Sequence, residues 1–183
     1  MRRSFSDAFP ILLHYTLQTS TTLHTLPCTA LQVRVGCPAG SELLDSGSCL
    51  QFLTSHCFEG CSRWRAMQEC RAEGGHLADS LALKDLVDLL ALAGSKYNTS
   101  TWWTGASDFS KLAGKFTWEA SSQALSDTPE LWVNGTGLAE GGGGEGHTCV
   151  YINHQEGGGG GMRLDTAPCQ AEVARPLCQY RNS

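Results

Sequence analysis

Nine cysteines in 183 residues are the feature that most limits how this chain can fold. Cytosolic thiols are kept reduced, so a chain this rich in cysteine is typical of an oxidising compartment, where disulfides form and persist. Two N-glycosylation sequons, at Asn98 and Asn134, point to the same compartment. We therefore expect a secreted, extracellular glycoprotein that is held together by disulfides.

Composition excludes two classes of protein. Hydrophobic residues make up 41% of the chain, enough for a core, while charged residues make up only 17%. The net charge is −5 and the basic residues are scattered, so we expect no nucleic-acid partner, because binding phosphates needs a concentrated basic patch. No run approaches the roughly 18 consecutive apolar residues of a membrane-spanning helix, so we also expect no membrane span.

Residues 1–35 are the place where a secretory signal belongs. Arg2 and Arg3 give a basic start, but the apolar run at residues 11–13 is short, and His14 and a Ser/Thr-rich stretch interrupt it. A signal peptide needs a longer apolar core. We interpret residues 1–35 as a poorly defined N-terminal segment, either a weak signal peptide or a misassigned amino terminus, and residues 36–181 as the domain.

A first helix is predicted over residues 63–73. Ser62 is a good N-cap, and Gly74 and Gly75 stand where a helix typically ends. Three residues at helical spacing share one face of this helix, namely Ala66, Met67 and Cys70.

A second helix is predicted over residues 81–93. Ser80 is its expected cap and Gly94 its expected end. The apolar stripe expected to face the core consists of Leu83, Leu86, Val87, Leu90 and Ala93.

Short strands are predicted on both sides of these helices, at residues 48–53, 101–105, 116–118, 149–152 and 176–180. Helices that come early and strands that come late favour an α+β fold. About forty residues between Gly105 and Cys149 show little regular pattern, and such a long irregular stretch is usually functional. The glycine runs at residues 141–144 and 157–161 are interpreted as loop insertions, because glycine loses much entropy when ordered.

The order of these features is more specific than any one of them. It resembles the long-form C-type lectin-like domain from Cys37 to Tyr180, and among the members of that family it looks most like secreted arthropod proteins. The residues that carry the resemblance are Cys37-Pro38-Ala39-Gly40, Gly47-Ser48-Cys49-Leu50-Gln51-Phe52, Trp64, Ala66, Cys70, Gly74-Gly75, Leu77-Ala78, Trp102-Trp103-Thr104-Gly105-Ala106, Phe116-Thr117-Trp118, Gly146-His147-Thr148-Cys149-Val150-Tyr151, Leu164-Asp165-Thr166-Ala167-Pro168-Cys169 and Leu177-Cys178. The resemblance implies two helices packed on small antiparallel β-sheets, with a long irregular loop region and disulfide staples.

The resemblance also implies a disulfide map, which spacing alone could not choose among roughly a hundred possible pairings of eight cysteines. In it, Cys70 pairs with Cys178, Cys149 with Cys169, and Cys37 with Cys49. Cys57 and Cys61 are left for a small local ring, and the alternative is a zinc site that also uses His56. Cys28 is the odd thiol, lost with a cleaved amino terminus or available for a disulfide-linked oligomer.

Sugar-binding members of the family hold their ligand through calcium, which takes six to eight oxygen ligands. The family supplies them from a Glu-Pro-Asn or Gln-Pro-Asp triplet, a Glu two residues before the third cysteine of the core pattern, and a Trp-Asn-Asp triplet. Here the Pro triplet is missing between Trp132 and Cys149, His147 replaces the Glu, and the last triplet reads Leu164-Asp165-Thr166. We therefore expect no calcium cofactor and no other metal, and Asp165 could simply cap a turn before Pro168.

Candidate ligand-binding residues lie mainly in the long loop, between Ala106 and Thr148. They are Trp132, Asn134, Glu140 and Glu145, with Asp165 added from the last triplet. Trp102, Trp103 and Trp118 lie in predicted strands and are expected in the core, whereas Trp132 could contact a ligand. His147 and His154 are expected to be plain surface residues rather than a pH switch or metal pair.

No arrangement of nucleophile, base and orienting group is visible, so we expect no enzyme. The predicted function is that of a secreted recognition protein of innate immunity, which binds carbohydrate or microbial-surface ligands through the long loop without the usual calcium site. The alternative is a calcium-independent domain that binds protein or serves a structural role. The ligand is thus a glycan or a protein.

Overall fold

The computed structural model of this chain describes residues 36–97, 100–109, 115–133, 135, 147–154 and 161–181. The predictions made for residues 1–35, Cys28 and the sequons at Asn98 and Asn134 lie outside the described residues. The same holds for Glu140, Glu145, the first glycine run and most of the second.

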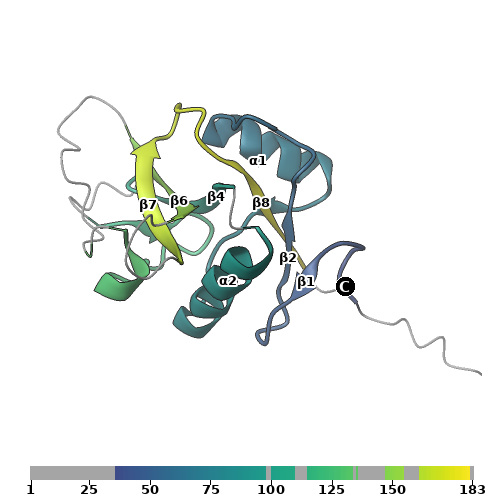
Figure 1. Ribbon diagram of the computed structural model, residues 1–183, viewed down its shortest axis with the longest axis horizontal. Coiled ribbons are helices and arrows are strands. Elements are labelled where there is room, and N and C mark those ends of the chain that lie inside the picture. The colour runs from purple at the N-terminus through teal and green to yellow at the C-terminus, as the bar shows by residue number, and fades with distance from the viewer. Residues whose placement is uncertain are drawn as a thin grey trace, which may run out of the picture. The chain divides into compact units, whose positions relative to one another are not determined.

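One mixed sheet forms the centre of the fold, with strand order β1-β2-β8-β4-β6-β7, while β3 pairs with β8 and β5 with β4 (Figure 1). Its strands are β1 Glu42–Leu43, β2 Cys49–Phe52, β3 His76–Leu77, β4 Trp102–Ser107, β5 Thr117–Trp118, β6 Thr148–His154, β7 Met162–Pro168 and β8 Arg175–Tyr180. The predicted strands are all present, and β1, β3 and β7 were not predicted. Two-residue strands such as β1 and β3 carry no period of their own that a sequence pattern could reveal.

The predicted α+β fold, with two helices on a sheet and a disulfide framework, is confirmed. The sheet differs from the expectation in two respects. The strands form one sheet rather than several small ones, and β4 and β8 run parallel, with Trp102 opposite Arg175 and Trp103 opposite Pro176. All other strand pairs are antiparallel. The parallel pair brings the chain's last strand into the middle of the sheet, between β2 and β4.

The first helix, α1, spans Arg63–Ala72 and is close to the prediction. The Ser62 side chain accepts a hydrogen bond from the backbone N–H of Arg65, which is the expected N-cap. Beyond the helix Gly74 has a φ of +82°, a left-handed conformation that glycine adopts without the steric cost paid by other residues. Of the predicted buried face, Ala66 and Cys70 are fully buried and Met67 is partly buried.

The second helix, α2, spans Leu83–Lys96, and three details of its prediction were wrong. Ser80 does not cap it, because Ser80 has a φ of +56° and its hydroxyl donates to the Asp79 carboxylate instead. Gly94 does not end it, because packing against the sheet sustains the helix for two more residues. Leu83 and Val87 are 50% and 47% exposed, and the buried apolar residues are Leu86, Leu89, Leu90 and Ala93.

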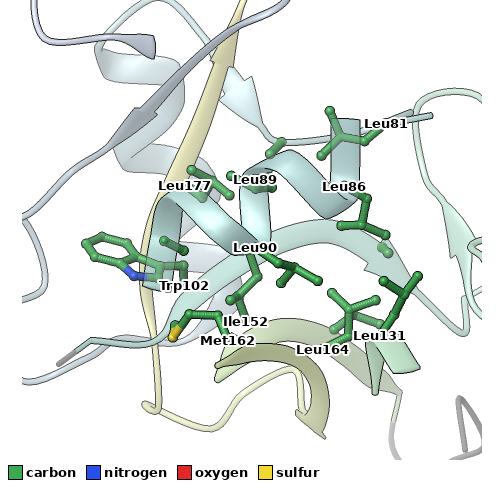
Figure 2. Packing of buried hydrophobic residues seen from close by; sticks show 14 of the residues in the cluster. Leu81, Leu86, Leu89, Leu90, Trp102, Leu131, Ile152, Met162, Leu164 and Leu177 are labelled. Atoms are coloured by element: carbon green, nitrogen blue, oxygen red, sulfur yellow. The ribbon is translucent and has the colours of Figure 1, made fainter. Parts of the chain in front are cut away.

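The core lies between α2 and the sheet (Figure 2). There Leu86, Leu89 and Leu90 of α2 face Ile152, Met162 and Leu164 of β6 and β7. Trp102 belongs to this cluster, while its neighbour Trp103 belongs to a second cluster beneath α1, since successive strand residues point to opposite faces. Trp118 is also buried, so the three tryptophans predicted in the core are there.

Four disulfides hold this framework together. Cys70 is bonded to Cys178, Cys149 to Cys169, and Cys37 to Cys49, which are the pairings that the resemblance implied. Cys57 and Cys61 close a local ring, so the alternative of a zinc site with His56 is not seen at these cysteines. Backbone hydrogen bonding in an isolated β-bridge between Cys61 and Ala174 joins this ring to the segment before β8.

Candidate ligand-binding site

The β6–β7 pair carries polar side chains on the face opposite the core cluster beneath α2. Val150 and Ile152 of β6 and Leu164 of β7 point into the core and are fully buried. The alternate residues Tyr151 and Asn153 therefore point to the other face, where they are half-buried. The antiparallel register places Tyr151 directly opposite Asp165, so the three side chains meet on one surface.

Asp165 is the centre of this group. One of its carboxylate oxygens accepts hydrogen bonds from the Tyr151 hydroxyl at 2.9 Å and from the Asn153 side-chain amide at 3.0 Å. The other oxygen accepts from the backbone N–H of Thr166 at 2.8 Å. We call Tyr151, Asn153 and Asp165 the polar triad.

The Tyr151 ring is fixed by more than its hydroxyl. Its ring lies edge-on to Trp103, with centroids 5.5 Å apart. Burial, and then the negative charge of Asp165, raise the pKa of Tyr151 well above its ordinary value. The hydroxyl therefore keeps its proton throughout the physiological range and acts as a hydrogen-bond donor to the carboxylate.

The polar triad has the hydrogen-bonding groups that recognise vicinal hydroxyls. An ionised carboxylate only accepts, whereas the Asn153 amide both donates and accepts, and a tyrosine hydroxyl can accept while it donates. Three donors already occupy Asp165, which leaves it about one further lone-pair site for a ligand hydroxyl. Partly exposed polar groups held in a fixed geometry suit a small polar ligand rather than an apolar one.

Trp132 does not contribute an exposed face, which corrects the expectation that it contacts ligand. It is only 4% exposed, its ring lies against Phe116 at 5.5 Å, and its Nε1–H donates to the carbonyl of Ser126 at 3.0 Å. The short 3-10 helix η1, Pro129–Leu131, turns the chain inward just before it. The large apolar ring is thus used to anchor the long loop to the core.

The described residues do not fit the calcium site of the family. Both oxygens of Asp165 already accept hydrogen bonds, and within the described ranges no group of three or more His, Cys, Asp or Glu side chains converges. His147, at the position of the family's Glu, immediately precedes β6. Asp165 pairs with Tyr151, which follows His147 by four residues. His147 and Asp165 are therefore separated by about 13 Å along the strand direction.

His147 contacts Asp108 and Phe109 instead. Its Nδ1 is 3.5 Å from the Asp108 carboxylate, which also accepts from the backbone N–H of Thr148 at 2.9 Å. The Phe109 ring lies tilted against the imidazole, with ring centroids 4.0 Å apart. His147 and His154 are both exposed, in agreement with the prediction that they are surface residues.

Of the two predicted ligand-binding residues that the structure describes, Trp132 and Asp165, only Asp165 is in this site, and it lies within β7 rather than capping a turn. Tyr151 and Asn153 were missed. The alternation of Tyr151, Ile152 and Asn153 would have placed them on one face of a strand. Their closeness to Asp165, however, depends on the register of β6 against β7.

Similar structures define the class of this domain. It is similar to the C-type lectin domain of murine dendritic cell inhibitory receptor 2, solved in complex with an N-glycan, with a TM-score of 0.58, 17% identity, and coverage of 80% of this chain and 99% of that one. It is similar to the carbohydrate-recognition domain of cow CD23, solved with an oligosaccharide, with a TM-score of 0.55, 20% identity, and coverage of 81% and 98%. The fold is therefore that of the C-type lectin-like domain.

The same fold also occurs in proteins of other function. A Ca²⁺-dependent type II antifreeze protein, in its Ca²⁺-free form, matches with a TM-score of 0.52, 19% identity, and coverage of 79% of this chain and 99% of that one. No protein-family model matches the chain, and no curated protein matches it in sequence. No helix in the described part of the chain is long and apolar enough to cross a membrane.

Proposed function

We propose that this chain is a secreted recognition protein of innate immunity that binds carbohydrate or microbial-surface ligands, in a binding rather than a catalytic role. The polar triad is the observation that carries the proposal. It presents a carboxylate, an amide and a hydroxyl on one half-buried surface, and the long loop bridges at Trp132 to Leu164, the neighbour of Asp165. The fold, shared with glycan-binding domains, supports the same ligand class.

Binding is proposed to need no calcium. The support is chemical, because calcium prefers several oxygen ligands and Asp165 offers one carboxylate whose oxygens already accept hydrogen bonds. Direct hydrogen bonds from the polar triad to sugar hydroxyls replace the metal in this proposal. Asn134, Glu140 and Glu145 of the long loop are proposed as further contacts.

The test is a glycan array probed with the full secreted chain, once with calcium and once with a chelator. We expect the same glycans to bind in both conditions. Asp165→Asn keeps the shape of the side chain but removes its charge, and Tyr151→Phe removes only the hydroxyl. Each should weaken binding about tenfold or more, the loss expected when a polar partner is left unpaired.

The matched control is Glu172→Gln, which removes one carboxylate charge from an exposed residue between β7 and β8, outside both the polar triad and the long loop. It should leave glycan binding unchanged. Binding that a chelator abolishes would contradict the calcium-independent mechanism. Binding that survives both triad substitutions would place the glycan elsewhere on the domain.

A second candidate function, binding of a protein, is favoured by one separate observation. Phe58 is 77% exposed in the Cys57–Cys61 ring, and the Arg175 guanidinium lies over its ring at 5.0 Å. Arg175 also donates to the Phe58 carbonyl at 2.6 Å, so the ring is held in place before any partner arrives. Fixed aromatic and arginine side chains are typical energetic centres of protein interfaces.

The two functions are separated by Phe58→Ser. Under the glycan proposal this substitution leaves the array signal intact, because Phe58 is not part of the polar triad and its exposed ring contacts Arg175. A silent array in both conditions, together with a protein ligand whose capture depends on Phe58, would favour the protein-binding domain.

A further inference from the structure

A positive charge stands beside the polar triad on the outward face of the β6–β7 pair. In the antiparallel register Arg163 of β7 lies directly opposite Asn153 of β6. Arg163 also precedes Asp165 by two residues, and strand residues two apart share a face of the sheet. The residues on either side of Arg163 in β7 are buried in the core. The Arg163 side chain therefore leaves the backbone on the same surface as the polar triad.

This charge is not neutralised within the part of the chain that the structure describes, where no carboxylate forms an ion pair with Arg163. The Asp165 carboxylate shares its face, but it is occupied by the other two side chains of the polar triad and by a backbone N–H. Glu130 lines the same surface hollow as Arg163, and these two side chains form no ion pair either. A cation that its own domain leaves unpaired is available to an anionic ligand.

The guanidinium of Arg163 also keeps most of its hydrogen-bonding capacity. The side chain is half-buried, and its Nη1 donates to the neutral carbonyl of Met162 at 2.9 Å. A guanidinium carries several N–H donors in a planar fork, so donors remain for a ligand beyond this one bond. Such a fork matches the paired oxygens of a carboxylate or of a tetrahedral oxyanion, and it binds them through two parallel hydrogen bonds.

We propose that Arg163 makes this surface selective for acidic glycans, which carry a carboxylate or sulfate group close to free hydroxyls. The inference rests on the proposed function, because it names the glycan class for the same site. The polar triad takes a sugar hydroxyl, and Arg163 takes the anionic group. Opposite positions of antiparallel strands lie about 5 Å apart and alternate positions of one strand about 7 Å apart. These separations are close to the span of one monosaccharide with its substituents.

The charges also set the orientation of the ligand. Asp165 is itself negative, so it repels an anionic group placed at the polar triad and favours one placed at Arg163. The whole chain has a net charge of −5, so its overall field does not attract anions. The preference for an acidic glycan is therefore local to Arg163. A neutral glycan would use the polar triad alone and leave the guanidinium bound only to its neighbour's carbonyl.

The test is an array of glycan pairs that differ only in one anionic group, probed with the full chain in the presence of a chelator. Some pairs carry a carboxylate and others a sulfate, which distinguishes the two sources of charge. We expect the acidic member of a pair to bind about tenfold more tightly than the neutral member. Added salt should narrow this difference, because ions screen partly exposed charges. The salt series uses the unaltered chain and needs no variant to fold.

Three variants locate the preference. Arg163→Gln removes the charge and the fork, and the ratio of acidic to neutral binding should fall to about one. Arg163→Lys keeps the charge without the fork and should retain part of the preference. Arg71→Gln is the matched control, because it removes the same charge from an exposed position of α1. It should leave the ratio at its original value.

Failure of this inference is distinguishable from failure of the proposed function. Glycans that bind through Asp165 without preference for acidic members would overturn the inference alone, and so would a preference that survives Arg163→Gln. An array that is silent for both members of every pair would overturn both proposals. β7 is the last strand in the sheet order, and a charge there can also keep strands of other molecules away. An Arg163→Gln chain that self-associates with an unchanged ratio would show this edge role and overturn glycan selection.

Discussion

The guanidinium of Arg63 lies 2.7 Å from the carboxylate of Glu119 and joins the first turn of α1 to the turn after β5. Arg63 is 6% exposed, its Nε donates to the carbonyl of Thr104 at 3.3 Å, and the Ser107 hydroxyl donates to the same Glu119 oxygen at 2.7 Å. The base of the long loop is therefore fastened to the helix by a charged network.

Loss of this ion pair should destabilise the domain. Arg63→Met leaves Glu119 without its cation, and we expect a loss of about 2 kcal/mol. This is less than for a fully buried pair, because the Glu119 side chain is 35% exposed and solvent screens it. Urea unfolding with the disulfides intact measures this loss in the free energy of unfolding. Arg71→Met, on the exposed face of the same helix, is the control and should change stability little. Equal losses in both variants would contradict the assignment.

Tyr151 should make stability depend on pH in the alkaline range. Its pKa is raised in the folded state, mainly by burial and then by Asp165. The folded protein therefore binds this proton more tightly than the unfolded chain. The resulting stability is complete below the unfolded tyrosine pKa of about 10 and is lost as the pH rises through the folded value.

Absorbance titration of the tyrosines measures this directly. Tyr151 and Tyr180 should ionise later than an ordinary tyrosine, since the pKa of Tyr180 is also raised by burial and by Glu73. In the Tyr151→Phe variant, one of these two late-ionising tyrosines should be missing from the titration. Asp165→Asn should lower the pKa of Tyr151 without restoring its ordinary value, because burial is the larger cause. A Tyr151 that titrates normally in the intact protein would refute the buried, paired hydroxyl.

The four disulfides should contribute unequally to stability. Cys70–Cys178 spans 108 residues, and Cys57–Cys61 spans only 4. Closing a longer loop removes more entropy from the unfolded chain, so we expect losses of about 4–5 kcal/mol for the first bond and about 2 kcal/mol for the second. Paired Cys→Ala variants, compared by denaturant unfolding, test the order. A larger loss from the small ring would show that the ring has a native-state role beyond chain entropy.

Gly105 should tolerate no larger residue. A Cβ at this position would lie 2.5 Å from the Asp79 carboxylate and 3.0 Å from the carbonyl of Ala78, so Gly105→Ala should cost about 1–3 kcal/mol. Gly94→Ala is the contrasting variant, because a Cβ there would meet Met162 at an ordinary 3.7 Å. It should stabilise the helix by about 1 kcal/mol. Thermal unfolding of both variants distinguishes the two outcomes.

Several elements were predictable because their causes are local or come in a fixed order. Ser62 begins α1 through its capping side chain, and Gly74 ends it through the left-handed backbone that glycine prefers. Both effects act within one helical turn. The spacing of cysteines, tryptophans and glycines, read through the family resemblance, was enough for the fold class and three disulfide pairings. Adjacent Trp102 and Trp103 had to face opposite sides of their strand.

The candidate site and the two ends of α2 required the tertiary structure. Ser80 is a good cap by residue type, but its hydroxyl donates a hydrogen bond to the buried Asp79 carboxylate instead. The chain then turns before the helix begins. Val87 belongs to an apolar stripe by spacing, but the sheet covers only part of that stripe. Trp132 was expected to be available to ligand, and the turn through η1 buries it.

The sequence by itself therefore determined a disulfide-rich chain with a C-type lectin-like framework and a degenerate set of calcium ligands. Only the tertiary structure decided that Asp165 is bound by Tyr151 and Asn153, that Trp132 lies in the core, and that Leu83 and Val87 remain outside it. The physical reason is the range of the interactions. Caps, turns and alternation act between neighbours in the chain, whereas strand register and helix docking depend on how distant segments share one core.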